Sequence, residues 1–410
     1  MSTTASTRAG ALAFMLAPHE TTAFFAATFE REPLHVERGD AAYFAGVYGV
    51  GDVEDALIVG AREPEQFALF KGGSGLAAEE FTYERPSVRW RLTGKPPRRW
   101  VDARRVVSHF ADGYTVIIKD AALFSARLQR FCNRLQCDLF SIAQANVYYT
   151  PPAAQGFAVH HDTHDTLTAQ IEGEKTWLIY EPVVRLPMES KPFHSGTKMP
   201  GLRLLREVRV RAGDTLYIPR GFPHEAKTSG GTSLHCTFAL LPIRIADVTD
   251  MLAHVTSDAD VELRRALRPG ELSAERLARR AAASYDDPEA RATLERRTQE
   301  ALDITVNELF RLTRPNADDA FARALRALDV TADTPVRIDE GVPFMLRERA
   351  QSIELLIAGK AVAFPKFCVP AFTRLQEGPT TAGEMDPSLS PENRALFVKL
   401  LVLEGLVVAG

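Results

Sequence analysis

The feature that most constrains the fold is a series of short, β-rich runs between residues 138 and 241. Val, Ile, Thr, Tyr and Phe dominate these runs and turn residues separate them, which is typical of strands. Glu172-Gly173-Glu174 and Ala212-Gly213-Asp214 are predicted to be hairpin-like turns. Many short strands at this spacing favour a double-stranded β-helix, also called a jelly roll. The predicted strands are residues 139–149, 157–161, 166–171, 176–180, 208–211, 215–218 and 233–241.

The sequences on either side of this stretch are largely helical in pattern. Residues 104–137 predict a helix, a buried strand and a second helix, and residues 245–330 are rich in Ala, Leu, Arg and Glu at helical spacing. Residues 340–410 fit a small winged-helix-like module. Apolar helix faces outside the β-rich core need a partner, so we expect a homodimer. The predicted fold class is α+β, with domains at residues 1–244, 245–335 and 336–410.

An imidazole and a carboxylate stand two residues apart in the β-rich stretch, at His160 and Asp162. Side chains at positions i and i+2 of a strand share one face, so both can point into one cavity. A further histidine, His224, follows a Pro/Gly turn later in the same stretch. Two nitrogen ligands and one oxygen ligand leave open positions on a metal, as in non-haem Fe(II) oxygenases. The sequence therefore predicts a metal centre at His160, Asp162 and His224, with His164 and Asp165 as competing ligands nearby.

Activation of O₂ at such a centre needs two further electrons, which 2-oxoglutarate supplies when it is decarboxylated to succinate. The distal carboxylate of 2-oxoglutarate then needs a cationic partner. Lys175 begins the strand after the turn at Gly173, and its ammonium group, with the hydroxyl of Tyr148, can hold a carboxylate by charge-assisted hydrogen bonds. Asn146 shares a strand face with Tyr148. A surface lysine beside a turn explains Lys175 equally well from spacing alone.

Longer motifs surround these candidate residues and together resemble a known family. They are Gly156-Phe157-Ala158-x-His160-x-Asp162, then Gln170-Ile171-Glu172-Gly173-x-Lys175-x-Trp177, then Gly213-Asp214-x-Leu216-Tyr217-x-Pro219-Arg220-Gly221-x-x-His224. The match extends to Asn146-x-Tyr148 and to Ser233-Leu234-His235-Cys236-Thr237. Over about residues 140–241 the chain resembles the JmjC-type ribosomal oxygenases.

This resemblance implies a cupin-fold protein hydroxylase that depends on Fe(II) and 2-oxoglutarate. It also implies a helical dimerisation region and a C-terminal winged-helix module after the catalytic domain. The implied substrates are O₂ and a protein or peptide, in this family a ribosomal protein. By motif position the implied iron ligands are His160, Asp162 and His224, and the residues implied to line the 2-oxoglutarate pocket are Lys175, Tyr148, Asn146 and Thr237.

Two positions depart from the family pattern. Val159 stands where one branch has proline, and Ala239 stands where a small hydroxyl residue is common. Neither is a metal ligand, but the second bears on the target, so hydroxylation of a peptide or a small molecule is an alternative. A non-catalytic protein with a vestigial cupin site and a winged-helix binding module is an alternative from another class.

Composition narrows the possible partners. The 410 residues are 45% hydrophobic and 25% charged, which is ordinary for globular domains, and the net charge of −4 argues against a general nucleic-acid-binding surface while leaving room for a local basic patch. Four cysteines without a CxxC pair predict neither a disulfide framework nor a zinc site, which fits a reducing cytoplasm. No apolar run reaches the length that spans a bilayer. We therefore expect a cytoplasmic protein without direct membrane or nucleic-acid contact.

Overall fold

A computed structural model describes residues 10–85, 97–152, 158–188, 201–228, 230–266, 288–315, 317, 319–339 and 341–410 of the chain. The chain divides into two compact units, Met1–Leu241 and Pro242–Gly410, which we call unit 1 and unit 2. The predicted division into residues 1–244, 245–335 and 336–410 is finer and stays a prediction.

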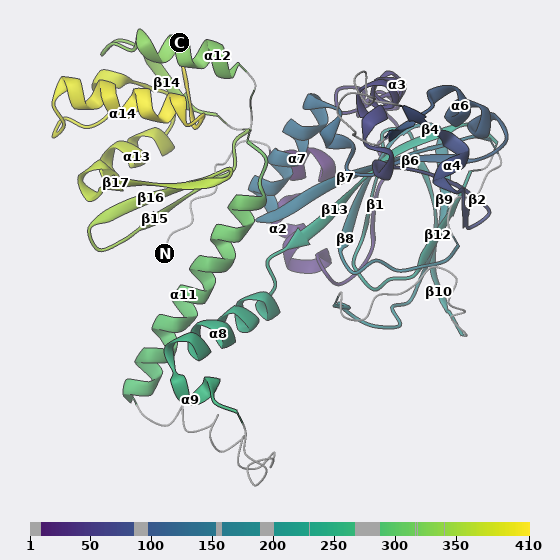
Figure 1. Cartoon of the computed structure of the whole chain (residues 1–410), viewed down its shortest axis with the longest axis horizontal. Helices are drawn as coiled ribbons and strands as arrows, with labels where there is room; N and C mark the ends of the chain where they lie inside the picture. Colours follow the sequence, from purple (N-terminus) through teal and green to yellow (C-terminus); the bar gives the residue numbers. More distant parts are fainter. Residues whose placement is uncertain are drawn as a thin grey trace. The chain divides into compact units, whose positions relative to one another are not determined.

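Unit 1 is built on two facing sheets (Figure 1). Among the described residues the larger sheet has the strand order β1-β11-β8-β13-β7-β6-β2-β3, and the smaller has the order β10-β9-β12. The strands are β1 (Leu34–Val36), β2 (Phe67–Lys71), β3 (Ser74–Gly75), β6 (Thr115–Ile118), β7 (Ser141–Thr150), β8 (Asp165–Glu172), β9 (Glu174–Tyr180), β10 (Leu204–Arg211), β11 (Thr215–Ile218), β12 (His224–Lys227) and β13 (Ser233–Pro242).

The path of the chain between the two sheets is that of a jelly roll. From β8 onward it passes from the larger sheet to β9 and β10 in the smaller one, then to β11, β12 and β13 in alternate sheets. Trp177, Ile179 and Val210 of the smaller sheet form one apolar cluster with Leu216 and Ile218 of the larger sheet, so the two sheets pack face to face. The predicted jelly roll is therefore present.

Helices cover the other face of the larger sheet. Leu167 and Ala169 of β8 pack in one core with Leu12 and Leu128, which come from two of these helices. Because side chains alternate along a strand, the intervening Thr168 is turned toward the smaller sheet. The space between the sheets is therefore lined partly by polar side chains. The helices of unit 1 are α1 (Ala11–Leu16), α2 (Thr21–Ala23), α3 (Val50–Val59), α4 (Ala78–Phe81), α6 (Ala103–Ala111) and α7 (Ala126–Leu139), and a π-helical turn spans Phe24–Thr28.

The two turns predicted as hairpins do not join paired strands, so that prediction is wrong. Gly173 connects β8 to β9, Gly213 connects β10 to β11, and each turn passes from one sheet to the other. Both glycines have positive φ angles, of 65° and 92°. A Cβ atom on either would lie 1.9 Å from a backbone oxygen, that of Thr232 or of Asp40. The change of sheet brings other backbone so close that only glycine fits.

The strand predicted over residues 157–161 is also shorter than expected. Residue 157 lies outside the described residues, and the described part forms only an isolated antiparallel bridge between His160 and His224. The segment is still extended at that bridge, so the two histidine backbones are adjacent.

Unit 2 has its own apolar core. Its helices are α8 (Ile245–Ala259), α9 (Val261–Arg264), α11 (Pro288–Leu312), α12 (Ala320–Leu328), α13 (Val369–Gln376) and α14 (Pro391–Leu403), of which α8 packs along α11. Its strands are β14 (Pro335–Ile338), β15 (Phe344–Glu348), β16 (Ser352–Ile357), β17 (Lys360–Pro365), β18 (Thr380–Thr381) and β19 (Val407–Ala409). No helix among the described residues of either unit combines the length and apolar character needed to cross a membrane.

Candidate metal centre

The three predicted metal ligands lie together in unit 1. Each of His160, Asp162 and His224 offers one ligand atom, and these atoms all lie within 4.8 Å of one another. The Nε2 atom of His224 lies 3.7 Å from Oδ2 of Asp162, and the two imidazole centroids are 4.7 Å apart. This spacing is suitable for three ligands of a single metal ion.

Backbone hydrogen bonds hold the two ligand-bearing segments side by side. The N–H of His160 donates to the carbonyl of His224 at 3.1 Å, and the N–H of His224 donates back to the carbonyl of His160 at 2.7 Å. The N–H of Gly221 donates to the carbonyl of Asp162 at 3.0 Å. The turn before β12 is thus fastened to the segment that carries the other two ligands.

Each histidine ring is oriented by its own backbone. Nδ1 of His160 lies 2.9 Å from the carbonyl of Ala158, and Nδ1 of His224 lies 3.0 Å from the carbonyl of Phe222. A carbonyl oxygen only accepts, so each Nδ1 must carry the proton. The Nε2 lone pair of each neutral ring is then available to a metal, which is the common arrangement of metal-binding histidines.

The protonation states also suit a metal. Burial, together with the neighbouring His160, lowers the pKa of His224 to about 4, so this imidazole is neutral at physiological pH. Burial acts to raise the pKa of the Asp162 carboxyl, but nearby imidazoles, first that of His224, outweigh it and the pKa is lowered. Metal ligands of these types must be deprotonated, and both are.

The competing ligand Asp165 is occupied elsewhere. Its fully buried carboxylate accepts from Nη1 of Arg220 at 2.7 Å and from the hydroxyl of Tyr217 at 2.8 Å. Arg220 is also paired with Glu30 at 2.6 Å. We call Asp165, Arg220, Tyr217 and Glu30 the buried clamp. It ties the start of β8, near Asp162, to the turn that precedes His224.

The other competing ligand, His164, does not belong to the group of ligand atoms. It acts on the site through its charge, because it is one of the imidazoles that lower the pKa of Asp162. The sequence pattern identified Pro219-Arg220-Gly221 only as a turn and so missed the clamp. An arginine in a turn close to a ligand histidine was the available signal.

The predicted lysine is buried between the two sheets among other polar side chains. Lys175 is 5% exposed, and burial lowers the pKa of its ammonium group from the ordinary 10.5 to about 7. His235 is buried too, and burial and Lys175 together lower its pKa. The ring of Tyr148 stacks on that of His235, with centroids 4.7 Å apart and planes inclined by 4°. Nε1 of Trp177 and Nδ1 of His235 are buried without a hydrogen-bond partner among the described residues.

The two remaining pocket candidates already make contacts within the protein. The hydroxyls of Thr237 and Thr168 lie 2.9 Å apart between β13 and β8. The side-chain oxygen of Asn146 accepts from the backbone N–H of Asp120 at 3.0 Å. The sequence patterns did not single out Thr168, although it lies two residues before Gln170 on the same strand face.

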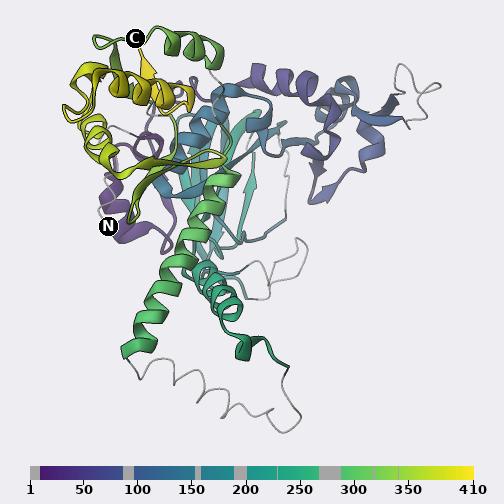
Figure 2. The same cartoon turned by 60° about the vertical axis from the view of Figure 1, so that its left-hand side comes forward.

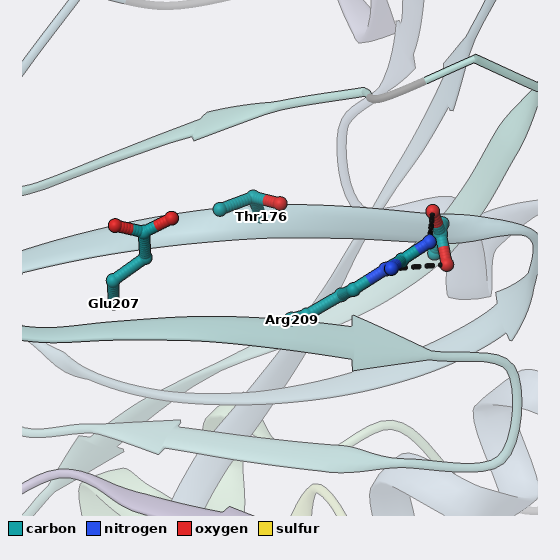
Figure 3. A pocket seen from close by; sticks show the side chains of 4 residues that line it. Thr176, Glu207 and Arg209 are labelled. Carbon is teal, nitrogen blue, oxygen red and sulfur yellow. Dashed lines mark hydrogen bonds and ion pairs between the residues drawn. The ribbon is translucent and has the colours of Figure 1, made fainter.

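A hollow of about 500 Å³ lies on the outer surface of the smaller sheet and does not include the metal ligands (Figure 3). Glu174, Thr176, Glu207 and Arg209 border it. Arg209 donates from Nε to Glu174 at 2.8 Å, so the charges there are largely satisfied. Thr176 faces outward because it alternates along β9 with the inward-facing Lys175 and Trp177.

Fold and site together define a class, namely jelly-roll proteins with a centre of two histidines and one carboxylate. Residues 120–248 match the JmjC domain family. The chain is 31% identical over 263 residues to ribosomal oxygenase 1 of Homo sapiens and 28% identical over 268 residues to the bifunctional lysine-specific demethylase and histidyl-hydroxylase NO66 of Drosophila melanogaster. Each alignment covers 62% of this chain but only 38% of the relative.

Solved structures show the same fold. That of E. coli ycfD has a TM-score of 0.53 at 13% identity, and that of the E. coli ribosomal oxygenase YcfD with cobalt and 2-oxoglutarate has a TM-score of 0.51 at 13% identity. Both alignments cover 96% of this chain and 98% of the other. The resemblance predicted from the motifs is confirmed: residues 120–248 match the JmjC domain, and the chain is similar to ribosomal oxygenase 1 over 62% of its length.

Proposed function

We propose that this protein is an Fe(II)- and 2-oxoglutarate-dependent oxygenase that hydroxylates an amino-acid side chain of a protein. The observation that carries the proposal is the metal-ligand cluster of His160, Asp162 and His224 in the same jelly roll as the buried Lys175. Three protein ligands leave open positions on an iron ion for a co-substrate and O₂. The bound iron and 2-oxoglutarate would supply O₂ activation and the two electrons it needs.

The buried polar residues around Lys175 suit a dicarboxylate ligand. A buried ammonium group without a carboxylate nearby is unfavourable, and a ligand carboxylate would remove that cost. The indole N–H of Trp177, which has no partner among the described residues, is a further donor, and Nδ1 of His235 can donate or accept according to its tautomer. We assign the distal carboxylate of 2-oxoglutarate to Lys175 and Tyr148, and we keep Thr237 and Asn146 as expected lining residues.

The protein's part in the reaction is to bind, orient and exclude water. The backbone contacts of Nδ1 leave the Nε2 atoms of His160 and His224 available as the atoms that would hold the iron ion. The stacked ring of His235 restrains the ring of Tyr148. The apolar cluster around Trp177 and Ile218 excludes water from part of the space between the two sheets. Charge interactions are stronger where water is excluded.

The chain spans only 38% of the length of human ribosomal oxygenase 1 and of Drosophila melanogaster NO66, so the target is a proposal too. The names of those relatives refer to ribosomal oxygenation and histidyl hydroxylation. We propose a ribosomal protein as substrate and the cytoplasm as the site of action. We also propose that residues 245–335 mediate homodimerisation and that residues 336–410 form a winged-helix-like module, since they contain helices packed on short strands around one core.

The test compares 2-oxoglutarate turnover in Asp162→Ala, His224→Ala and wild-type protein supplied with Fe(II) and O₂. Succinate formation should fall to background in both variants while circular dichroism stays unchanged. His254→Ala, at an exposed histidine of α8, is the matched control and should keep full turnover. Undiminished succinate in the two ligand variants would reject the assignment.

The substrate is sought by mass spectrometry of ribosomal proteins incubated with the wild type and with Asp162→Ala. A gain of one oxygen atom on a single side chain, seen only with the wild type, is the expected result. Oxygen gained only on free amino acids or small peptides would overturn the assignment of a protein substrate while leaving the oxygenase assignment intact.

A further inference from the structure

A small hairpin of unit 1 presents one face that the proposed oxygenase chemistry does not use. It consists of β4 (Thr82–Arg85) and β5 (Arg98–Val101), which form a two-stranded sheet of their own. Figure 2 shows it projecting away from the two main sheets.

The strand register assigns the side chains to two faces. Thr82 lies opposite Val101, and both are buried, so that side of the hairpin is turned to the core. Directly opposed residues share a face, and faces alternate along a strand. The pair of Tyr83 and Trp100 and the pair of Arg85 and Arg98 therefore lie on the outward side. Tyr83 is 38% exposed, and both arginines are exposed.

A third arginine joins this outward side from another segment. The guanidinium carbon of Arg62 lies 5.0 Å from the ring centroid of Trp100, and that of Arg85 lies 4.2 Å from it. Such cation–π contacts hold the guanidinium planes against the indole and leave their N–H edges accessible. We call Arg62, Tyr83, Arg85, Arg98 and Trp100 the hairpin face.

The charges of the hairpin face are not balanced by the protein. None of Arg62, Arg85 and Arg98 has an ion-pair partner among the residues that the structure describes, whereas Arg99, on the opposite side, lies 3.5 Å from Glu79. Like charges directly opposed across two strands, as Arg85 and Arg98 are, destabilise a hairpin. An anion bound across this pair would turn an unfavourable contact into a favourable one.

The sequence shows the same imbalance. Residues 85–105 contain seven arginines and one lysine against one aspartate, in a chain whose net charge is −4. The expectation of no nucleic-acid contact rested on that net charge, which says nothing about a local concentration of one sign. Evenly spread charge would have left such a stretch near neutral.

We propose that the hairpin face binds single-stranded RNA. Phosphate groups suit guanidinium edges because arginine offers paired N–H donors, and an exposed aromatic ring beside a basic strip is the usual platform for a stacked base. An acidic peptide would account for the arginines of the hairpin face but not for the exposed ring of Tyr83. This inference is independent of the metal centre and goes beyond the proposed oxygenase activity.

The test is fluorescence anisotropy of a labelled single-stranded RNA of about 12 nucleotides with the full chain. The wild type should bind at about 150 mM salt. Arg85→Glu/Arg98→Glu should lower the affinity by about tenfold or more. It should also reduce the slope of log K against log salt by about 1.4, the value for two lost phosphate contacts on a single strand. Arg134→Glu/Arg337→Glu, which changes the net charge equally at exposed arginines outside the hairpin face and outside residues 245–335, should bind as the wild type does.

A second variant separates stacking from charge. Tyr83→Ala should weaken binding by about tenfold without changing the salt dependence. Equal loss of affinity in the two double variants, or no RNA binding by the wild type, would overturn the proposal. Binding to anionic lipid vesicles through the same face, without RNA binding, would also overturn it. Asp162→Ala should bind RNA normally, so failure of the oxygenase assignment and failure of this one are distinguishable.

Discussion

The buried Lys175 provides the sharpest test of the site. Removing its ammonium group should raise the free energy of unfolding even though the group is expected to bind the co-substrate. Lys175→Met keeps an unbranched side chain of similar length and removes the buried charge. We expect the variant to be more stable than the wild type in the absence of ligands and unable to bind 2-oxoglutarate.

The magnitude follows from the lowered pKa. A pKa that falls from 10.5 in the unfolded chain to about 7 in the fold corresponds to roughly 5 kcal/mol at about 1.4 kcal/mol per pH unit. Between these two values the unfolded chain binds more protons than the fold, so this group makes stability rise with pH. The loss of folding stability caused by the buried ammonium group is full below pH 7 and disappears above pH 10.5. From pH 7 to pH 9 the free energy of unfolding of the wild type should rise by about 2 kcal/mol more than that of the variant.

The assay is urea denaturation of both proteins, without metal or 2-oxoglutarate, at pH 7 and pH 9. Lys227→Met, at a half-exposed lysine of β12, is the control and should change stability by about 0.5 kcal/mol or less. A Lys175→Met protein that is no more stable than the wild type, with a difference that does not vary with pH, would show that the ammonium has a counter-charge in the fold. Burial by itself lowers the pKa of His235 and raises that of Tyr148, so both side chains stay neutral from pH 7 to pH 9 with or without Lys175.

Three further outcomes follow from the structure. Arg220→Met should cost about 3–5 kcal/mol in urea denaturation because it removes the buried counter-charge of Asp165 and leaves only the Tyr217 hydroxyl and a backbone N–H as donors. Arg203→Met, at an exposed ion pair, should cost far less, and equal costs would argue against the clamp. Divalent cobalt at about 100 times its Kd should stabilise the wild type by about 2.7 kcal/mol and should have no effect on Asp162→Ala, so stabilisation of both would place the metal elsewhere. Analytical ultracentrifugation at micromolar concentration should give twice the 45.3 kDa chain mass, and a species of 45.3 kDa would refute the homodimer.

The sequence predicted the grouping of His160, Asp162 and His224 because its signals were local. His160 and Asp162 are two residues apart, and the turn residues before His224 mark the start of a strand. The predicted strands 166–171, 176–180 and 215–218 agree with β8, β9 and β11 to within two residues at each end. Each depends on alternation and turn chemistry, which are properties of neighbouring residues.

The sequence predicted the environment of those residues less well. The turn at Gly173 was read as a hairpin, because a glycine turn between two strand patterns has the same local appearance whether the strands pair or part. Arg220 was read as part of a turn, although its side chain crosses to Asp165. The burial of Lys175 was left undecided, because a lysine after a turn is exposed or buried according to which sheet covers it.

Strand periodicity, turn chemistry and the identity of the three candidate ligands were thus properties of the sequence alone. Only the tertiary structure decided that His224 lies against His160, that Lys175 is buried between the sheets, and that Arg85 and Arg98 share an outward face. The physical reason is range: side-chain alternation is set by the backbone of one strand, whereas pairing between distant strands depends on which apolar surfaces the whole chain can bury together.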